Sequence, residues 1–360
     1  MLVISYNCSL DFVPHNDSLL VCFVILQFLL SIPPPTIFQY VQIPFPLSLL
    51  PLSRNSNRFL GRDVFIDFSR HEYLFWLLCG ETPETFSHLF NSVRRDIVMS
   101  RRDGEQRITQ GRPHILDERN RLLLVLIWLR KYPSFDFLAL TFDISIPTIS
   151  GTIHQIAPIL WHHFHSLISW PTLRQWRNLR NTWRHFPNAV GAIDGTYTPI
   201  NRPQENQQRF FNGHRHRHVM TIQVVCDCLG HLRFVQAGFP GHLNDAGTYM
   251  RMESIGPGLT LDFPDDCELL ADKAYPARAP LRTMWRQAQL RRMPRRFHRV
   301  AIQQNRYHKR YRMKVEHTIK HIKDYKASKH IWRHPRWFQP VIFELCAFMA
   351  ERHIRLFESL

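Results

Sequence analysis

Four acidic side chains could bind metal ions in an otherwise strongly basic chain. They are Asp194, Asp245, Asp272 and Glu316, in the segments AIDGTY, GHLNDAGTY, LLADKAYP and KVEHTIKHIK. Hard divalent cations prefer carboxylate oxygens, and two-metal phosphoryl transfer needs carboxylates from distant parts of a chain to converge. The spacings of 51, 27 and 44 residues are long enough for the chain to cross a sheet between successive acids. Together, and in this order, the four acids predict one divalent-metal site.

Taken singly, each acid also fits an ordinary structural role. These roles are a strand-ending turn for Asp194, a helix cap for Asp245, an ion pair of Asp272 with Lys273 or a nearby arginine, and an ion pair of Glu316 with Lys320.

The charge balance indicates a polyanionic partner. The formal net charge is +17 and the pI is about 10.0, while 44% of the residues are hydrophobic, enough to bury real cores. Between Arg282 and Trp337 there are 18 Lys and Arg but only two acids, Glu316 and Asp324. A carboxylate there runs against the local charge, which favours a chemical role for Glu316. Nucleic acid is the expected partner.

Residues 1–60 differ in composition from the rest. The first 53 contain no Lys or Arg, and Leu19 to Ile32 is an apolar run of 14 residues, shorter than the roughly 20 that cross a bilayer. We expect an unstructured extension, or sequence that is not part of the natural product. A membrane anchor is the less favoured alternative.

Residues 65–187 predict an all-α region. Helices are expected at 85–97 and in RNRLLLVLIWLRKY, followed by a helix-turn-helix at about 134–163. Its first helix covers 134–142 and its second begins near Pro147. The residues expected to point outward from the second helix are Thr148, Ser150, Thr152, His154 and Gln155. The alternative is a helical hairpin that touches no DNA.

Residues 188–355 predict a region that combines strands and helices. Strands are expected at 188–200 and 267–271, a hairpin at 218–227 and 232–239, and a helix at 310–326. Cys226 and Cys228 are interpreted as ordinary strand residues beside a turn, with a zinc site as the less favoured alternative.

Basic residues at 291–314 alternate with Phe297, Tyr307 and Tyr311. Lys and Arg neutralise phosphates and aromatic rings stack on exposed bases, so this stretch predicts contacts with DNA. A solvated basic face is the alternative.

The motif series AIDGTY, GFPGHLND, LLADKAYP and V-E-x-x-I-x-x-I-K resembles the PIF/Harbinger transposase-derived nuclease family, DDE-superfamily endonucleases, over roughly Phe65 to Leu360. The resemblance implies an α/β fold in which an RNase H-like catalytic domain, a mixed sheet with flanking helices, follows an all-α helix-turn-helix region. It implies two-metal cleavage of DNA phosphodiester bonds with Mg²⁺ or Mn²⁺. Asp194, Asp245 and Glu316 would be catalytic, and the metal ligands would be these three together with Asp272.

One motif departs from the family pattern. A Lys-rich run is replaced by FNGHRHRH, so backbone contacts there depend on Arg215, Arg217 and His side chains. The full set of expected DNA-binding residues is Arg215, Arg217, Arg295, Arg296, Arg310, Lys314 and Lys320.

The resemblance also suggests where and with what the protein acts. We expect the nucleus, with the cytoplasm as the alternative, a separate Myb-like DNA-binding partner protein and, as an open option, a homo-oligomer; a membrane location is not expected. The competing functional hypothesis is a transposase-derived DNA-binding protein that no longer cuts.

Overall fold

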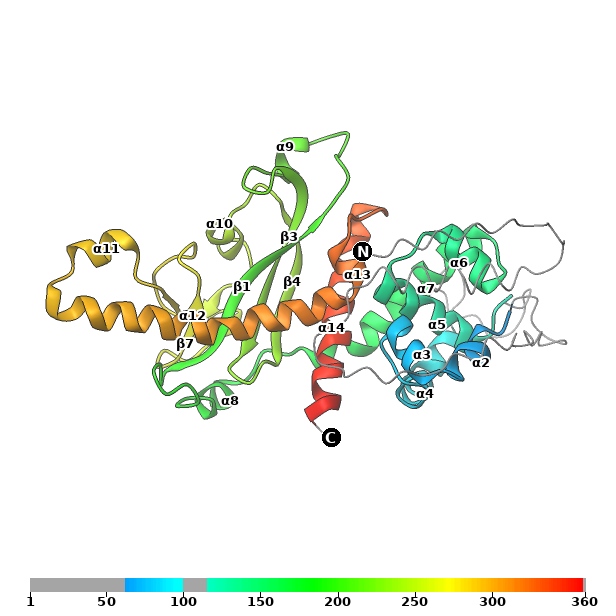
Figure 1. Cartoon of the computed structure of the whole chain (residues 1–360), viewed down its shortest axis with the longest axis horizontal. Helices are drawn as coiled ribbons and strands as arrows, with labels where there is room; N and C mark the ends of the chain where they lie inside the picture. The colour runs from blue at the N-terminus through cyan, green and yellow to red at the C-terminus, as the bar shows by residue number, and fades with distance from the viewer. Residues whose placement is uncertain (1–61, 100–114, 359–360) are drawn as a thin grey trace, which may run out of the picture.

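Helices form the first half of the chain in the computed structural model, which describes residues 62–99 and 115–358 (Figure 1). They are α2 (Val64–Ser69), α3 (Glu72–Cys79), α4 (Pro83–Met99), α5 (Glu118–Lys131), α6 (Phe135–Phe142) and α7 (Ile146–Phe164), with a 3₁₀ turn η1 (His165–Leu167). The predicted helices at 85–97 and 119–132 correspond to α4 and α5, and the helix-turn-helix corresponds to α6 and α7. Nearly every side chain of α5 is buried, as expected for a helix that is apolar all round and is covered on every side.

Side chains in the sequence fix where these helices begin. The carboxylate of Asp117 accepts from the amide of Asn120 at 2.8 Å, and the hydroxyl of Ser134 accepts from the amide of Phe137 at 3.3 Å. Each bond satisfies an amide that the first turn of a helix leaves without a partner. Helix α6 ends at Asp143, whose left-handed backbone produces the tight turn into α7.

A mixed sheet forms the second half. Within the described residues its strands are β1 (Ala189–Pro199), β2 (Phe211–Asn212), β3 (Arg217–Asp227), β4 (Leu232–Pro240), β7 (Glu268–Ala271) and β8 (Leu281–Thr283). Antiparallel β3 pairs with β1 on one side and with β4 and β2 on the other, whereas β1, β7 and β8 run parallel. All strands predicted from the sequence are present, and the mixed sheet with flanking helices after an all-α region confirms the predicted fold class.

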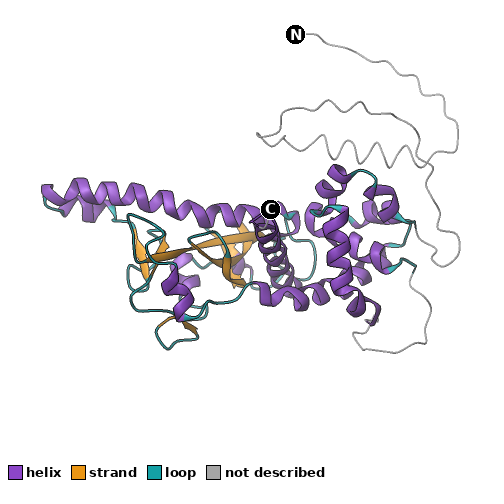
Figure 2. Cartoon of the chain, turned by 90° about the horizontal axis from the view of Figure 1, so that it is seen from below, coloured by secondary structure: helices purple, strands orange, loops and turns teal. Residues whose placement is uncertain are grey.

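Helix α12 (Arg295–Asp324) lies along the sheet and is much longer than the predicted helix at 310–326 (Figure 2). Its 30 residues give a length of about 45 Å. The N-terminal half of α12 and helix α11 (Gln287–Arg292) extend beyond the strands (Figure 1). The C-terminal half turns Val315 and Ile322 into the core.

Short elements complete this half. They are α8 (Leu173–Asn178), α9 (Gln207–Phe210), α10 (Asp245–Tyr249), β5 (Ile255–Gly256), β6 (Leu261–Asp262), α13 (Lys326–Lys329) and η2 (Arg336–Phe338).

Helix α14 (Gln339–Glu358) joins the two halves because it packs on both α7 and β4. The Trp161 indole donates to Glu344 at 3.0 Å, and Arg352 donates to the buried Glu81 at 2.5 Å. Burial alone would raise the pKa of Glu81, but the hydrogen bond from His353 and the charge of Arg352 outweigh it and lower the pKa. Residues of both halves therefore belong to one apolar core.

The apolar run at Leu19 to Ile32 and the rest of the predicted extension at 1–60 lie outside the described residues. Among the helices that the structure describes, none combines the length and apolar character needed to cross a membrane.

Candidate active site

Strand β1 positions Asp194 in the middle of the sheet, opposite Val224 of β3. The interpretation of Asp194 as a strand-ending turn residue is therefore wrong. Its Oδ1 accepts from the Gly195 amide at 3.1 Å and its Oδ2 accepts from Arg312 Nη1 at 2.9 Å. Burial raises the pKa of Asp194 to about 6, with the guanidinium of Arg312 opposing this effect and the charge of Asp245 adding to it.

Asp245 approaches β1 from the start of α10. The cap of α10 is Asn244, which accepts from the Gly247 amide at 2.7 Å, so the interpretation of Asp245 as the cap is also wrong. A Cβ built on Gly195 would lie 2.6 Å from Asp245 Oδ1, which places this carboxylate against the backbone next to Asp194. Burial, and then the charge of Asp272, raise the pKa of Asp245.

Asp272 directly follows β7, the parallel neighbour of β1. The negative charge of Asp272 helps to raise the pKa of Asp245. Asp272 forms no ion pair with Lys273 or any other base in the described part of the chain. The structure thus places Asp194 on β1 and Asp272 at the end of the neighbouring strand of the sheet, with Asp245 of α10 against β1.

Glu316 reaches the same region from α12 through one intermediate side chain. Arg312, one turn earlier on the helix, donates to Glu316 as well as to Asp194. The ion-pair partner of Glu316 is therefore Arg312 and not Lys320, the partner expected in its ordinary structural role. The Glu316 side chain is 45% exposed, whereas that of Arg312 is only 13% exposed.

The donor set suits a hard divalent cation. It consists of carboxylate oxygens only. Asp245 lies beside a second carboxylate and is half-buried, and its side chain has no hydrogen bond or ion pair among the described residues. Like charges that are both withdrawn from water are costly unless a cation compensates them. Within residues 62–99 and 115–358, however, no three His, Cys, Asp or Glu side chains converge closely enough to hold a metal ion. The four-ligand metal site therefore stays a prediction.

Several site residues were not found from the sequence. Buried Gln223 of β3 accepts from the Tyr275 hydroxyl at 2.9 Å, and its Nε2 lies 3.5 Å from the Cβ position of Gly195. Gln223 is the polar residue in the apolar run TIQVV, which is the signal that could have identified it. Arg312 is one of 18 Lys and Arg between Arg282 and Trp337 and had no distinguishing signal among them, apart from its i,i+4 spacing to Glu316.

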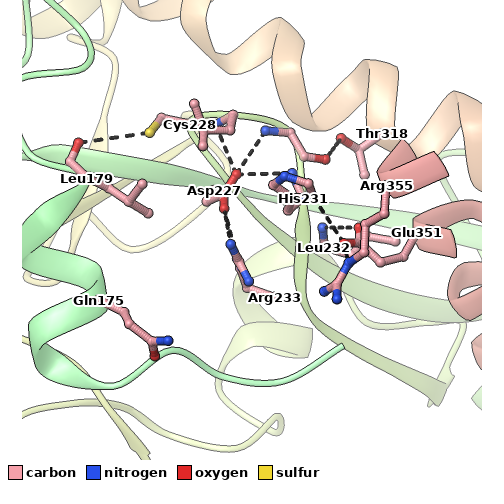
Figure 3. Close-up of polar contacts among 12 residues, drawn as sticks. Gln175, Leu179, Asp227, Cys228, His231, Leu232, Arg233, Thr318, Glu351 and Arg355 are labelled. Atoms are coloured by element: carbon pink, nitrogen blue, oxygen red, sulfur yellow. Dashed lines mark hydrogen bonds and ion pairs between the residues drawn. The ribbon is translucent and has the colours of Figure 1, made fainter. Parts of the chain in front are cut away.

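A further buried acid, Asp227, is structural (Figure 3). Its Oδ1 accepts from the amides of residues 229–231 and its Oδ2 accepts from Arg233 Nε at 2.8 Å. Next to it, Glu351 of α14 accepts from the Leu232 amide at 2.8 Å. These bonds fix the β3–β4 turn. Cys226 and Cys228 are buried beside this turn, the position expected for ordinary strand residues.

The predicted DNA contacts divide into two groups. Arg215 and Arg217 are exposed at the start of β3, and the charge of Arg215 lowers the pKa of Asp245 against the effect of burial, so Arg215 lies near the carboxylates. Arg295, Arg296, Arg310, Lys314 and Lys320 are exposed along α12.

Helix geometry separates two of them from the carboxylates. Residues two apart on a helix point roughly 160° apart, so Arg310 and Lys314 do not share the face of Arg312. Consistently, Lys314 lies over Gly230 of the β3–β4 turn. Exposed Lys309, three residues before Arg312, shares the carboxylate face but was not among the predicted contacts.

Most aromatic side chains of α12 that were expected to contact DNA stack on other residues of the protein. Tyr307 stacks on His185 with ring centroids 3.4 Å apart, and Tyr311 stacks on Trp183 at 5.1 Å. The prediction that these two tyrosines stack on bases is therefore wrong for the conformation described. Phe297, with the Arg296 guanidinium over its ring, is exposed.

The helix-turn-helix is packed more deeply than predicted. Thr152 is buried, Gln155 accepts from Arg121 at 2.5 Å, and His154 stacks on Phe338 at 4.7 Å. These three residues, expected to point outward from α7, therefore contact other parts of the protein, and His154 and Gln155 remain partly exposed. Thr148 and Ser150 are only partly exposed.

Comparison with known proteins adds two family matches. A family profile described as "DDE superfamily endonuclease" matches residues 193–350, and one described as "Helix-turn-helix of DDE superfamily endonuclease" matches residues 114–166. All four acids lie inside the first match, and α6 and α7 lie inside the second.

Two relatives are similar over different lengths. "Probable transposase for insertion sequence element IS702" from Microchaete diplosiphon is 22% identical over 263 residues, 71% of this chain and 85% of its own length. "Putative nuclease HARBI1" from Rattus norvegicus is 28% identical over 90 residues, a quarter of each chain. No solved structure matches.

Proposed function

Because this chain belongs to the DDE superfamily of endonucleases, we propose that it is a divalent-metal-dependent nuclease that cleaves phosphodiester bonds of DNA. Asp194, Asp245 and Glu316 are the proposed catalytic carboxylates and Asp272 the fourth metal ligand. The observation that carries the proposal is the approach of Asp245 to β1 at Gly195, directly beside Asp194. Two half-buried carboxylates from residues 51 positions apart meet there, and burial raises the pKa of both.

Some residues of the site would bind the metal ions and others would bind DNA. When bound, Mg²⁺ or Mn²⁺ would lower the pKa of an attacking water or hydroxyl and stabilise the leaving oxygen. The Gly195 amide donates to Asp194, and the buried Tyr275–Gln223 pair lies next to Gly195. Arg215 and Lys309 are exposed, and they would neutralise phosphates.

The finer identity follows the same motifs. We propose a transposase-derived nuclease of the PIF/Harbinger type, acting in the nucleus on DNA. The names of the two relatives, a transposase and a nuclease, support this assignment. A Myb-like DNA-binding partner and self-association belong to this proposal and would be tested by adding the partner or by measuring mass in solution.

The test is nicking of supercoiled DNA by the full chain in Mg²⁺, in Mn²⁺ and in chelator. Asp194→Ala and Glu316→Gln should abolish nicking. Asp324→Asn is the matched control, since Asp324 is an acid of the same helix that pairs with His321 away from the site. Cutting that needs metal and disappears only in the first two variants would support the proposal.

The alternative is a DNA-binding protein that no longer cuts. It predicts metal-independent DNA binding with equal affinity in wild type and Asp194→Ala, and no nicking under any of these conditions. That combined result would refute the nuclease proposal.

A further inference from the structure

We propose that the guanidinium of Arg312 is the resident cation of the carboxylate site: it holds Asp194 and Glu316 together before a divalent metal ion binds, and it must release them when one does. The inference rests on the proposed function because it concerns the same carboxylates.

The geometry of Arg312 is that of a bridge between two elements. Nη1 donates to Asp194 Oδ2 of β1 at 2.9 Å and Nη2 donates to Glu316 Oε1 of α12. Arginine presents several donors in a fixed planar fork, so one side chain can engage both carboxylates. Two oxygens that a metal ion would require are therefore already hydrogen-bonded to a cation.

The position of Arg312 is interior, which distinguishes it from the surface arginines of α12. Its side chain is 13% exposed, less than either carboxylate that it joins, and its Nε is buried without a hydrogen-bond partner among the described residues. A guanidinium that is withdrawn from water in this way is costly unless carboxylates pair with it, and the same holds for the carboxylates.

Other bases do not duplicate this role. Arg215 and His214 act on Asp245 through their charge, and no ion pair joins either of them to an acid in the part of the chain described here. The positive charge shared by Asp194 and Glu316 therefore comes from Arg312. Arg312 and Glu316 are one helical turn apart on the same face of α12, so the helix presents both side chains to Asp194.

Competition between the guanidinium and a metal ion has a measurable consequence. Removing Arg312 frees two carboxylate oxygens from charge-assisted hydrogen bonds and removes a positive charge from the site. The affinity of the DNA-free protein for Mn²⁺ should then rise, by about tenfold or more. In Arg312→Lys the Mn²⁺ affinity should rise less, since lysine keeps the charge but cannot bridge both acids as a planar fork.

The experiment measures Mn²⁺ binding to the full chain without DNA, by the loss of the free-ion paramagnetic resonance signal. Wild type, Arg312→Met, Arg312→Lys, Asp194→Asn and Arg310→Met are compared. Arg310→Met is the matched control because it removes one positive charge two residues away, from the other side of the same helix. Arg312→Met should bind Mn²⁺ more tightly than both wild type and Arg310→Met.

A second readout covers the case in which Arg312→Met folds poorly. In chelator, Arg312→Met and Arg312→Lys should melt below wild type, and saturating Mn²⁺ should raise their melting temperatures by more than it raises that of wild type. Equal melting shifts, or Mn²⁺ affinity that is unchanged or weaker in both Arg312 variants, would overturn the inference. Wild-type Mn²⁺ binding that is insensitive to Asp194→Asn would instead overturn the proposed metal site itself.

Discussion

At Gly195, the addition of a single methyl group should lower catalytic activity while leaving the stability of the fold nearly unchanged. A Cβ there would lie 2.6 Å from Asp245 Oδ1, so the carboxylate would have to retreat by roughly 0.8 Å to reach an ordinary contact of 3.4 Å. Displacements near 1 Å in a catalytic constellation can cost on the order of 100-fold in rate. We therefore expect Gly195→Ala to lower the rate of metal-dependent nicking by about 10- to 100-fold.

Stability should change little in the same variant. The backbone at Gly195 does not require glycine, the obstructing atom is the end of a side chain, and alanine is preferred over glycine in a strand by about 0.5–1 kcal/mol. Urea unfolding should place Gly195→Ala within about 1 kcal/mol of wild type.

Two other glycines calibrate this prediction. A Cβ on Gly191 of the same strand would meet the backbone carbonyl of Cys226, so Gly191→Ala should lose about 1–3 kcal/mol of stability. Gly151 of α7 has no atom within 4 Å of its Cβ position, and Gly151→Ala should keep both stability and nicking. A Gly195→Ala protein that nicks at the wild-type rate and binds Mn²⁺ as wild type does would show that β1 does not position Asp245.

Three further outcomes are expected. Glu81→Gln should lower the free energy of unfolding by about 3 kcal/mol at pH 7, because Arg352 loses its buried partner. Since the pKa of Glu81 is lowered on folding, the contribution of Glu81 to stability is present above its unfolded pKa near 4.5 and is lost as pH falls below that value. Urea unfolding at pH 3–7 should therefore show a weaker dependence of stability on pH for the variant than for wild type. Replacing both Arg295 and Arg296 by Ser should reduce the slope of log affinity against log salt by about 2 in fluorescence anisotropy, and an unchanged slope would remove them from the DNA interface. Asp227→Asn should cost about 3 kcal/mol in the same unfolding assay yet leave Mn²⁺ affinity unchanged, whereas weaker Mn²⁺ binding would contradict its purely structural role.

The secondary structure was largely readable from the sequence because its signals are local. The largely apolar, β-branched run at 218–227, the continuous apolar run of α5 and the cap at Ser134 each depend on neighbouring residues only. The start of α12 was placed 15 residues too late because its N-terminal half projects from the sheet and has almost no apolar stripe to mark it.

The roles of individual side chains were less readable. Thr152 and His154 have the polarity of outward residues, yet Thr152 is buried and the half-buried His154 stacks on Phe338. Tyr307 and Tyr311 likewise lie against residues more than 120 positions away in the chain. A helical period shows which residues share a face, but it does not reveal what covers that face.

The sequence by itself predicted one metal site from the motifs and order of four acids, and it determined that an all-α region precedes a region of strands and helices, since strand and helix periods are local properties. Only the tertiary structure decided that Asp245 meets β1 at Gly195 and that Arg312 joins Asp194 to Glu316. Such contacts depend on strand register and on the rotation of α12 against the sheet. Both are fixed by burial of apolar surface throughout the domain, and no local run of residues records the result.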